Sequence, residues 1–182
     1  MKILVTEPIS EPGLKRLCEE LTVDVRCDLS REALMKSIGQ YDGIIVRGKT
    51  PLDRTLLQQA KKLKVIGRAG TGVDNIDMET ATRMGILVVN APESNTLSTA
   101  EHTIALLLAQ LRNIPRATAL LRSGKWNKSG LRGQEAYEKC LGIVGLGRIG
   151  SMVARMAQGL GMQVIAYDPY ISPDRFERFA VQ

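Results

Sequence analysis

The stretch from Leu141 to Asp168 restricts the possible fold more than any other part of this 182-residue chain. An apolar run, Leu141–Val144, leads into the pattern G-x-G-x-x-G at Gly145–Gly150. A helical pattern over Ser151–Leu160 and a second apolar run, Gln163–Tyr167, follow. A glycine-rich turn between a strand and a helix is typical of folds that bind a dinucleotide. We therefore predict a strand–turn–helix–strand unit of the Rossmann type.

Each residue of this turn has a chemical reason to be there. Gly145 permits the tight turn, Gly147 lets the backbone approach a pyrophosphate, and Gly150 lets helix and strand pack closely. The helix N-terminus offers amides and a favourable dipole to the pyrophosphate. Asp168 follows about 20 residues later, where a carboxylate accepts hydrogen bonds from the adenosine ribose. Because its charge repels a 2′-phosphate, we predict NAD rather than NADP; the alternative is a glycine turn that binds nothing.

The first ninety or so residues alternate short apolar runs with helical patterns. We expect strands at Ile3–Thr6, Thr22–Arg26, Gly43–Val46, Lys64–Gly67 and Ile86–Val89, and helices near Gly13–Glu20, Arg31–Ile38, Asp53–Ala60 and Asp77–Met84. This alternation predicts βαβ units, and continuously apolar strands predict a parallel sheet covered on both faces. The fold class is therefore α/β: a flavodoxin-like parallel-sheet substrate domain over residues 1–93, then the first part of a Rossmann dinucleotide-binding domain over 94–182.

A helical region separates the two series. Ser98 and Glu101 have the S-x-x-E form of a capping box, which predicts a helix start. The segment Ile104–Leu111 is almost wholly apolar, so it should be buried on most sides or lie in a subunit interface. Pro115 marks a break or a new helix, and a polar loop runs from Ser123 to about Glu138. We predict a homo-oligomer built around Ser98–Leu121 and the loop of Trp126.

Composition narrows the possible partners. The net charge is +6, but the basic residues are scattered and aromatic residues make up only 4% of the chain. No nucleic-acid-binding motif appears, so the charge indicates a solvated surface or attraction of small anions. The three cysteines lack metal-ligand spacing, which favours reduced thiols in the cytoplasm and no metal. No apolar run approaches the roughly 20 residues of a membrane span, and no secretory leader is visible.

Several segments together resemble the D-2-hydroxyacid dehydrogenase family. They are Arg68–Asp77 (RAGTGVDNID), Val89–Pro92, Ala100–Thr103 and the glycine turn, in this order along the chain. The similarity is greatest to the branch that acts on D-3-phosphoglycerate. It implies NAD-dependent oxidation of that acid to 3-phosphohydroxypyruvate, a step of serine synthesis. The alternatives are another D-2-hydroxyacid dehydrogenase, of the glyoxylate or hydroxypyruvate reductase type, or a non-catalytic NAD-sensing module that binds partners through Ile104–Leu111 and Trp126.

The resemblance also implies roles for individual residues. The amides of Ala69, Gly70 and Gly72 would hold the substrate carboxylate, and Thr71 would approach the nicotinamide. Arg148 and Ile149 would contact the pyrophosphate. The basic residues assigned to the substrate are Arg47, which would face the phosphate, Arg68, and Lys128, which would reach in from a neighbouring subunit. Gly48 stands where the family often has serine. The simpler alternatives are turn glycines at 70 and 72, and solvated strand ends at Arg47 and Arg68.

Catalysis of this kind needs a base for the hydroxyl proton. In the family a histidine, a glutamate and an arginine do this chemistry, and the resemblance places all three beyond these 182 residues. The only histidine, His102, follows Glu101, and adjacent helix residues point about 100° apart, so we interpret it as structural. The expectation is an N-terminal piece of an enzyme of roughly twice the length, inactive by itself.

Overall fold

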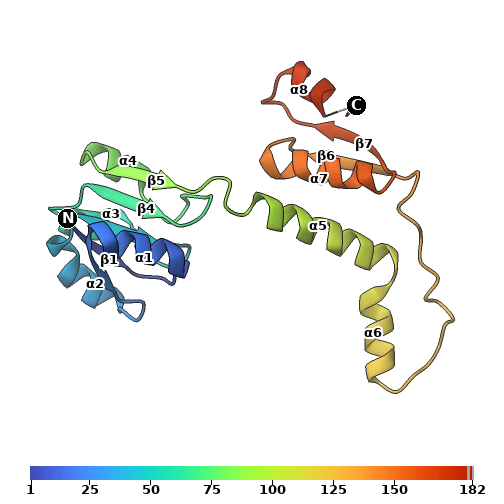
Figure 1. Cartoon of the computed structure of the whole chain (residues 1–182), viewed down its shortest axis with the longest axis horizontal. Coiled ribbons are helices and arrows are strands. Elements are labelled where there is room, and N and C mark those ends of the chain that lie inside the picture. Colours follow the sequence, from blue (N-terminus) through green and yellow to red (C-terminus); the bar gives the residue numbers. More distant parts are fainter. Residues whose placement is uncertain (180, 182) are drawn as a thin grey trace. The chain divides into compact units, whose positions relative to one another are not determined.

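The computed structural model describes residues 1–179 and 181. The chain forms two compact units, Met1–Ser94 and Asn95–Gln182, which we describe one at a time (Figure 1). Among the helices of the described residues, none has the length and apolarity needed to cross a membrane.

The first unit contains a sheet of five parallel strands, which confirms the predicted fold class. The strands are β1 (Lys2–Val5), β2 (Thr22–Val25), β3 (Gly43–Val46), β4 (Val65–Arg68) and β5 (Leu87–Asn90), in the order β2-β1-β3-β4-β5. This is the flavodoxin-like order. Each strand lies within one residue of its predicted bounds.

Helices link the strands of this sheet: α1 (Glu11–Glu20), α2 (Arg31–Ser37) with the short 3-10 helix η1 (Ile38–Gln40), α3 (Arg54–Gln59) and α4 (Met78–Arg83). Three of them begin at a capping side chain that accepts a backbone amide hydrogen: Ser30, Asp53 and Asp77. Such caps satisfy amides that have no partner inside the helix.

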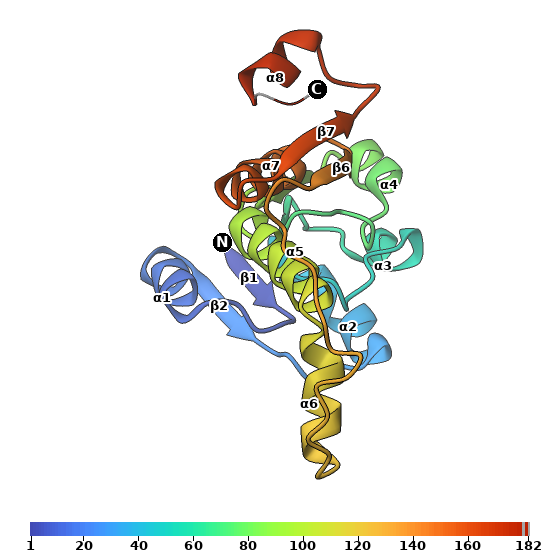
Figure 2. The ribbon, with the colours of Figure 1, turned by 90° about the vertical axis from the view of Figure 1, so that its right-hand side faces the viewer.

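The core of the first unit lies on one face of the sheet. Leu4, Ile44 and Ile66 from the strands pack there with side chains of α2, α3 and α4, including Leu56, which has no exposed surface. Right-handed crossovers that run in one direction along a sheet place their helices on the same face. Helix α1 connects in the opposite direction, lies on the other side of the strands (Figure 2) and contributes no buried residue.

Two helices open the second unit, α5 (Thr96–Leu111) and α6 (Ile114–Arg122). Asn95 is the residue before α5, and the Ser98 hydroxyl donates to the Asn95 carbonyl at 3.2 Å. The predicted capping box is therefore wrong, because Ser98 already lies in the first turn. Burial of Ile104–Leu111 on most sides is also wrong within this chain: Ala100 is the buried residue of α5, and Leu106 is 57% exposed. The interface alternative remains.

The glycine turn lies in the second unit between β6 (Cys140–Val144) and α7 (Arg148–Gly159), and β7 (Gln163–Tyr167) pairs with β6 in parallel. The helix α8 (Pro173–Arg178) follows. Side chains of α7 cover one face of the two strands. On the other face Val144 and Tyr167 are 89% and 65% exposed, so the described residues leave that face of the two strands uncovered.

The three glycines of the turn differ in what they permit. Gly145 has φ +97°, a conformation that L side chains rarely adopt. A Cβ on Gly150 would overlap the carbonyl oxygen of Gly145, whereas a Cβ on Gly147 would meet nothing within 4 Å. Close packing therefore requires Gly150, and open space borders Gly147.

This contrast predicts different effects of the same substitution. Gly150→Ala should lower the free energy of unfolding by about 1–3 kcal/mol, because the backbone of the turn must move. Gly147→Ala, the matched control, should cost less, about 0.5–1 kcal/mol, because its Cβ meets nothing and alanine is only a poorer N-cap residue than glycine. Urea unfolding followed by circular dichroism measures both, and equal losses would contradict the packing at Gly150.

Candidate functional site

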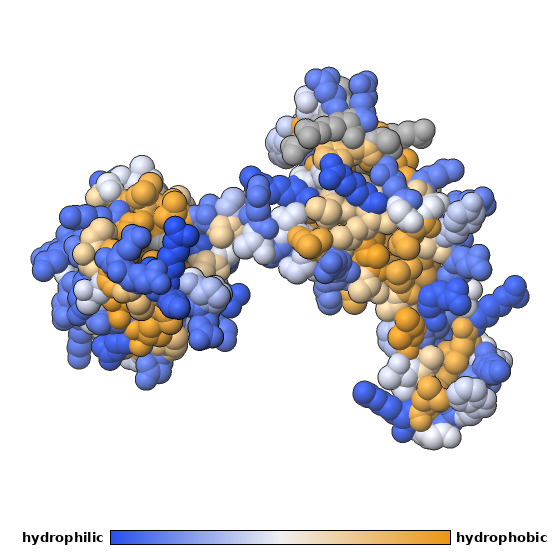
Figure 3. All heavy atoms as spheres, in the orientation of Figure 1, coloured by the Kyte–Doolittle hydropathy of each residue, from blue (hydrophilic) through white to orange (hydrophobic). Residues whose placement is uncertain are grey.

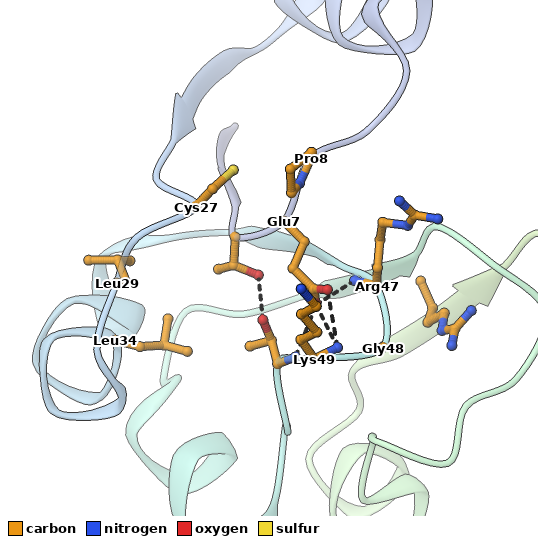
Figure 4. Close-up of a pocket in the computed structure, with 11 residues that line it drawn as sticks. Glu7, Pro8, Cys27, Leu29, Leu34, Arg47, Gly48 and Lys49 are labelled. Carbon is orange, nitrogen blue, oxygen red and sulfur yellow. Dashed lines mark hydrogen bonds between the residues drawn. The ribbon is translucent and has the colours of Figure 1, made fainter. Parts of the chain in front are cut away.

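A cavity of about 790 Å³ opens in the first unit at the carboxyl ends of its central strands (Figure 4). Its lining comes from the segments after β1, β2 and β3 and from the end of β4: Thr6, Glu7, Pro8, Cys27, Leu29, Leu34, Arg47, Gly48, Lys49, Thr50 and Arg68. The chain leaves β1 toward one edge of the sheet and leaves β3 toward the other. Ligands of open α/β sheets bind at this kind of reversal.

Cations dominate the charged side chains of this cavity. Arg47 directly follows β3 and Arg68 ends β4, and the register of the two strands pairs Val46 with Arg68. Lys49 adds a third positive charge, against one carboxylate, that of Glu7. Arg68 is partly buried, and its Nε has no hydrogen-bond partner. The structure thus brings together the predicted Arg47 and Arg68 in a cavity suited to an anion.

Glu7, which follows β1 in the lining of this cavity, is a buried carboxylate, 7% exposed. It accepts hydrogen bonds from the backbone amides of Arg47 at 2.8 Å, Lys49 at 3.1 Å and Thr50 at 3.0 Å. Burial raises the pKa of the Glu7 carboxyl, but the amide hydrogen bonds together lower it more, so that the pKa lies below its ordinary value. The group is therefore ionised at neutral pH.

The loop after β4 carries the amides predicted to hold a carboxylate. The Ala69 amide donates to the Val46 carbonyl and the Gly70 amide to the Arg68 carbonyl, each at 2.8 Å. Of the three predicted amides, only that of Gly72 has no protein acceptor among residues 1–179 and 181. The Asn90 side chain fixes this loop by donating to the Thr71 carbonyl at 2.6 Å.

Gly48 leaves room beside the arginines. A Cβ there would lie 3.6 Å from Nη2 of Arg68, an ordinary contact. The Cβ of a serine, the residue that the resemblance leads one to expect, would therefore be accommodated at this position.

The predicted cofactor residues of the second unit lie together around the glycine turn. Gly147 is the N-cap of α7, and Arg148 and Ile149 are its first two residues. The Asp168 carboxylate accepts hydrogen bonds from the amides of Leu146 at 2.8 Å and Tyr170 at 2.9 Å. A hollow of about 430 Å³ between α5, β6 and α7 borders the turn.

The remaining candidates lie elsewhere in the chain. Thr71 belongs to the first unit and Lys128 to the second, where its Nζ lies 5.8 Å from the centre of the Trp126 ring. His102 is exposed within α5. Cys18, Cys27 and Cys140 are free and exposed. Within the described part of the chain, no three His, Cys, Asp or Glu side chains gather as metal ligands.

Residues 3–175 match the model of the D-isomer-specific 2-hydroxyacid dehydrogenase family, catalytic domain. The chain belongs to this family. It is 48% identical to a D-3-phosphoglycerate dehydrogenase of Archaeoglobus fulgidus, covering 100% of this chain and 35% of the relative. A D-3-phosphoglycerate dehydrogenase of Rattus norvegicus is 44% identical over 34% of its length. The chain thus spans about a third of the length of these relatives.

Solved structures agree with this assignment. The TT0316 protein of Thermus thermophilus superposes with a TM-score of 0.87 at 36% identity, over 95% of this chain and 58% of that one. A D-lactate dehydrogenase of Aquifex aeolicus, solved with NAD and lactic acid, gives a TM-score of 0.83 at 26% identity, over 98% of this chain and 54% of that one.

The roles of Glu7 and Asn75 were not predicted from the sequence. Glu7 stands at the carboxyl end of β1, where ligand-binding groups of such sheets gather, and this position was an available signal. Asn75 lies inside the conspicuous segment Arg68–Asp77, and its side chain donates to the carbonyls of Arg47 and Thr50.

The low pKa of Glu7 predicts an acid dependence of stability. The unfolded chain binds a proton at Glu7 near its ordinary pKa of 4.5, before the folded chain does. Its contribution is therefore fully present above that pH and is lost as the pH falls through the folded-state pKa. Glu7→Gln should lower stability at pH 7 and flatten the fall in stability as the pH drops below 4.5. Urea titrations across this range measure it.

The control is Glu19→Gln, the same change at an exposed position of α1, which should follow the wild-type curve. A Glu7→Gln curve parallel to that of the wild type would show that the amide bonds do not stabilise the ionised carboxylate.

Proposed function

We propose that this chain supplies the substrate site and half of the cofactor site of an NAD-dependent enzyme that oxidises D-3-phosphoglycerate to 3-phosphohydroxypyruvate in serine synthesis. The observation that carries the proposal is the cationic cavity of Arg47, Lys49 and Arg68. A simple 2-hydroxy acid carries one negative charge, whereas a phosphate ester adds about −1.5 to −2 at pH 7. Three cations against one carboxylate favour the phosphorylated acid.

The side chains here would bind and orient the substrate rather than perform the proton transfer. Arg47 would pair with the phosphate, as arginine suits planar two-point contacts with phosphate oxygens. The Gly72 amide and Arg68 would hold the carboxylate, with Ala69 and Gly70 shaping the loop, and Thr71 would face the nicotinamide.

NAD fits the geometry of the second unit. The open space at Gly147, which a Cβ would fill, is where the pyrophosphate would approach the amides at the start of α7. Gly145, Arg148, Ile149 and Gly150 complete this cradle. Asp168 would bind the ribose and disfavour the 2′-phosphate of NADP. When bound, NAD accepts the hydride from the substrate.

The cofactor assignment predicts selective binding. In an NMR titration the 182-residue chain should bind NAD more tightly than NADP, and Gly147→Ala should weaken NAD binding about tenfold or more while the chain stays folded. Asp168→Asn should reduce the ratio of the NAD affinity to the NADP affinity, because the carboxylate that disfavours the 2′-phosphate is removed. With D-3-phosphoglycerate added, no NADH absorbance should develop, because the family's histidine base is not among these residues.

Three outcomes would contradict these assignments. Absence of NAD-induced shifts around Gly145–Gly150 counts against the cofactor site. If Gly147→Ala binds NAD as tightly as the wild type does, the proposed pyrophosphate site at the start of α7 is contradicted. Steady NADH production by this chain counts against its inactivity, and tighter binding of glyoxylate than of D-3-phosphoglycerate would favour an enzyme of the glyoxylate reductase type.

We also propose that the chain forms a homo-oligomer in the cytoplasm. The free, exposed cysteines fit a reducing compartment. Exposed apolar side chains gather over α6 and the following loop: Ile114 at 52%, Leu121 at 54% and Trp126 at 76% exposed. Figure 3 shows hydrophobic atoms along this otherwise hydrophilic region. In an oligomer Lys128, beside Trp126, would reach the substrate of a neighbouring subunit.

Light scattering should therefore give at least a dimer mass, and Leu121→Lys with Trp126→Ser should give a monomer because a buried unpaired charge is costly. Val25→Lys, at a 49% exposed position of the first unit, is the control and should leave the mass unchanged. A monomer mass for the wild type at every concentration would contradict the proposal.

A further inference from the structure

Two side chains from distant parts of the first unit hold the loop 47–50. Glu7 accepts the amide hydrogens of Arg47, Lys49 and Thr50. Asn75 takes the opposite polarity and donates through Nδ2 to the carbonyls of Arg47 at 2.8 Å and Thr50 at 2.7 Å. We call Glu7 and Asn75 the loop clamp. Between them they bind backbone donors and acceptors of one loop that has no helix or strand of its own.

This loop carries two of the three cations of the cavity. Arg47 and Lys49 project from the clamped backbone, and Figure 4 shows the Glu7 carboxylate directed at the segment that bears them. A loop of this kind, left free, would lose conformational entropy when a ligand ordered it, and that loss would weaken binding. Because Glu7 and Asn75 already hold the loop, this conformational entropy is lost when the chain folds and not when the ligand binds.

We propose that Glu7 and Asn75 are positioning residues for the anionic substrate, which hold Arg47 and Lys49 in the binding geometry without touching the ligand. The proposal rests on the substrate site of the proposed function.

Because Glu7 is negatively charged, its charge and its hold on the loop affect anion affinity in opposite directions, which makes the proposal testable. A carboxylate beside an anion site repels the ligand, so removal of its charge alone should tighten anion binding. Removal of the clamp should weaken binding, because the loop loses its ordered geometry. Glu7→Gln does both at once: the amide side chain is neutral, its Nε2 turns a donor toward the Lys49 amide that Oε2 accepts, and its Oε1 is only an uncharged, weaker acceptor for the amides of Arg47 and Thr50. The two roles therefore predict opposite changes.

The experiment is an NMR titration of the 182-residue chain with D-3-phosphoglycerate, with amide hydrogen exchange measured at Lys49 and Thr50. Glu7→Gln should bind about tenfold more weakly and exchange faster at both amides, because charge-assisted hydrogen bonds are lost. Asn75→Ala should also weaken binding, although the charge of Glu7 remains. If Glu7→Gln fails to fold, Asn75→Ala carries the test.

The matched control is Asp42→Asn. The Asp42 carboxylate also accepts a backbone amide, that of Lys2 at 2.8 Å, but it precedes β3 at the amino end of the sheet. This variant should bind like the wild type. Unchanged or tighter binding by Glu7→Gln or Asn75→Ala overturns the positioning role. If the wild type does not bind D-3-phosphoglycerate, the proposed function fails, and unchanged exchange at Lys49 and Thr50 in Glu7→Gln then overturns the clamp separately.

Discussion

The pairing of β1 with β3 determines most of what the first unit can do. Its register places Ile3 beside Gly43, where a Cβ would lie 2.6 Å from Cδ1 of Ile3, so a larger residue there would force the Ile3 side chain to shift. Because β2 pairs with the other edge of β1, the chain reverses direction at this point and leaves a cavity at the carboxyl ends. Glu7 and Arg47 meet there because their strands are neighbours. The cavity is therefore a consequence of strand order.

Features fixed by local chemistry could be predicted from the sequence. The strands follow from short apolar runs, because a buried parallel strand needs little beyond β-branched and aliphatic residues. The glycine turn follows likewise from its own spacing: Gly145 adopts positive φ, and Gly150 packs against the Gly145 carbonyl. Arg47 and Arg68 could be proposed because each stands at the end of a recognisable strand.

The features that the sequence did not reveal depend on distant residues. The S-x-x-E pattern at Ser98 fits a capping box, yet Asn95 already starts α5, and a pattern cannot choose between two possible first turns. Glu7 bonds to amides about 40 residues away, and a contact between a side chain and a distant backbone leaves no periodic signal.

The two units use one arrangement with different outcomes. In each, an acid at the carboxyl end of a strand accepts amide hydrogens from the loop that follows the neighbouring strand: Glu7 after β1 binds the loop after β3, and Asp168 after β7 binds Leu146 after β6. A carboxylate has about four lone-pair sites. Glu7 is buried, and its carboxylate accepts hydrogen bonds from three backbone amides. It therefore holds the backbone of the loop. Asp168 is only partly buried and accepts two amides, so it retains acceptor capacity for the ribose hydroxyl that we propose it binds. The difference in burial thus underlies the two proposed roles, support of the backbone for Glu7 and contact with the ligand for Asp168.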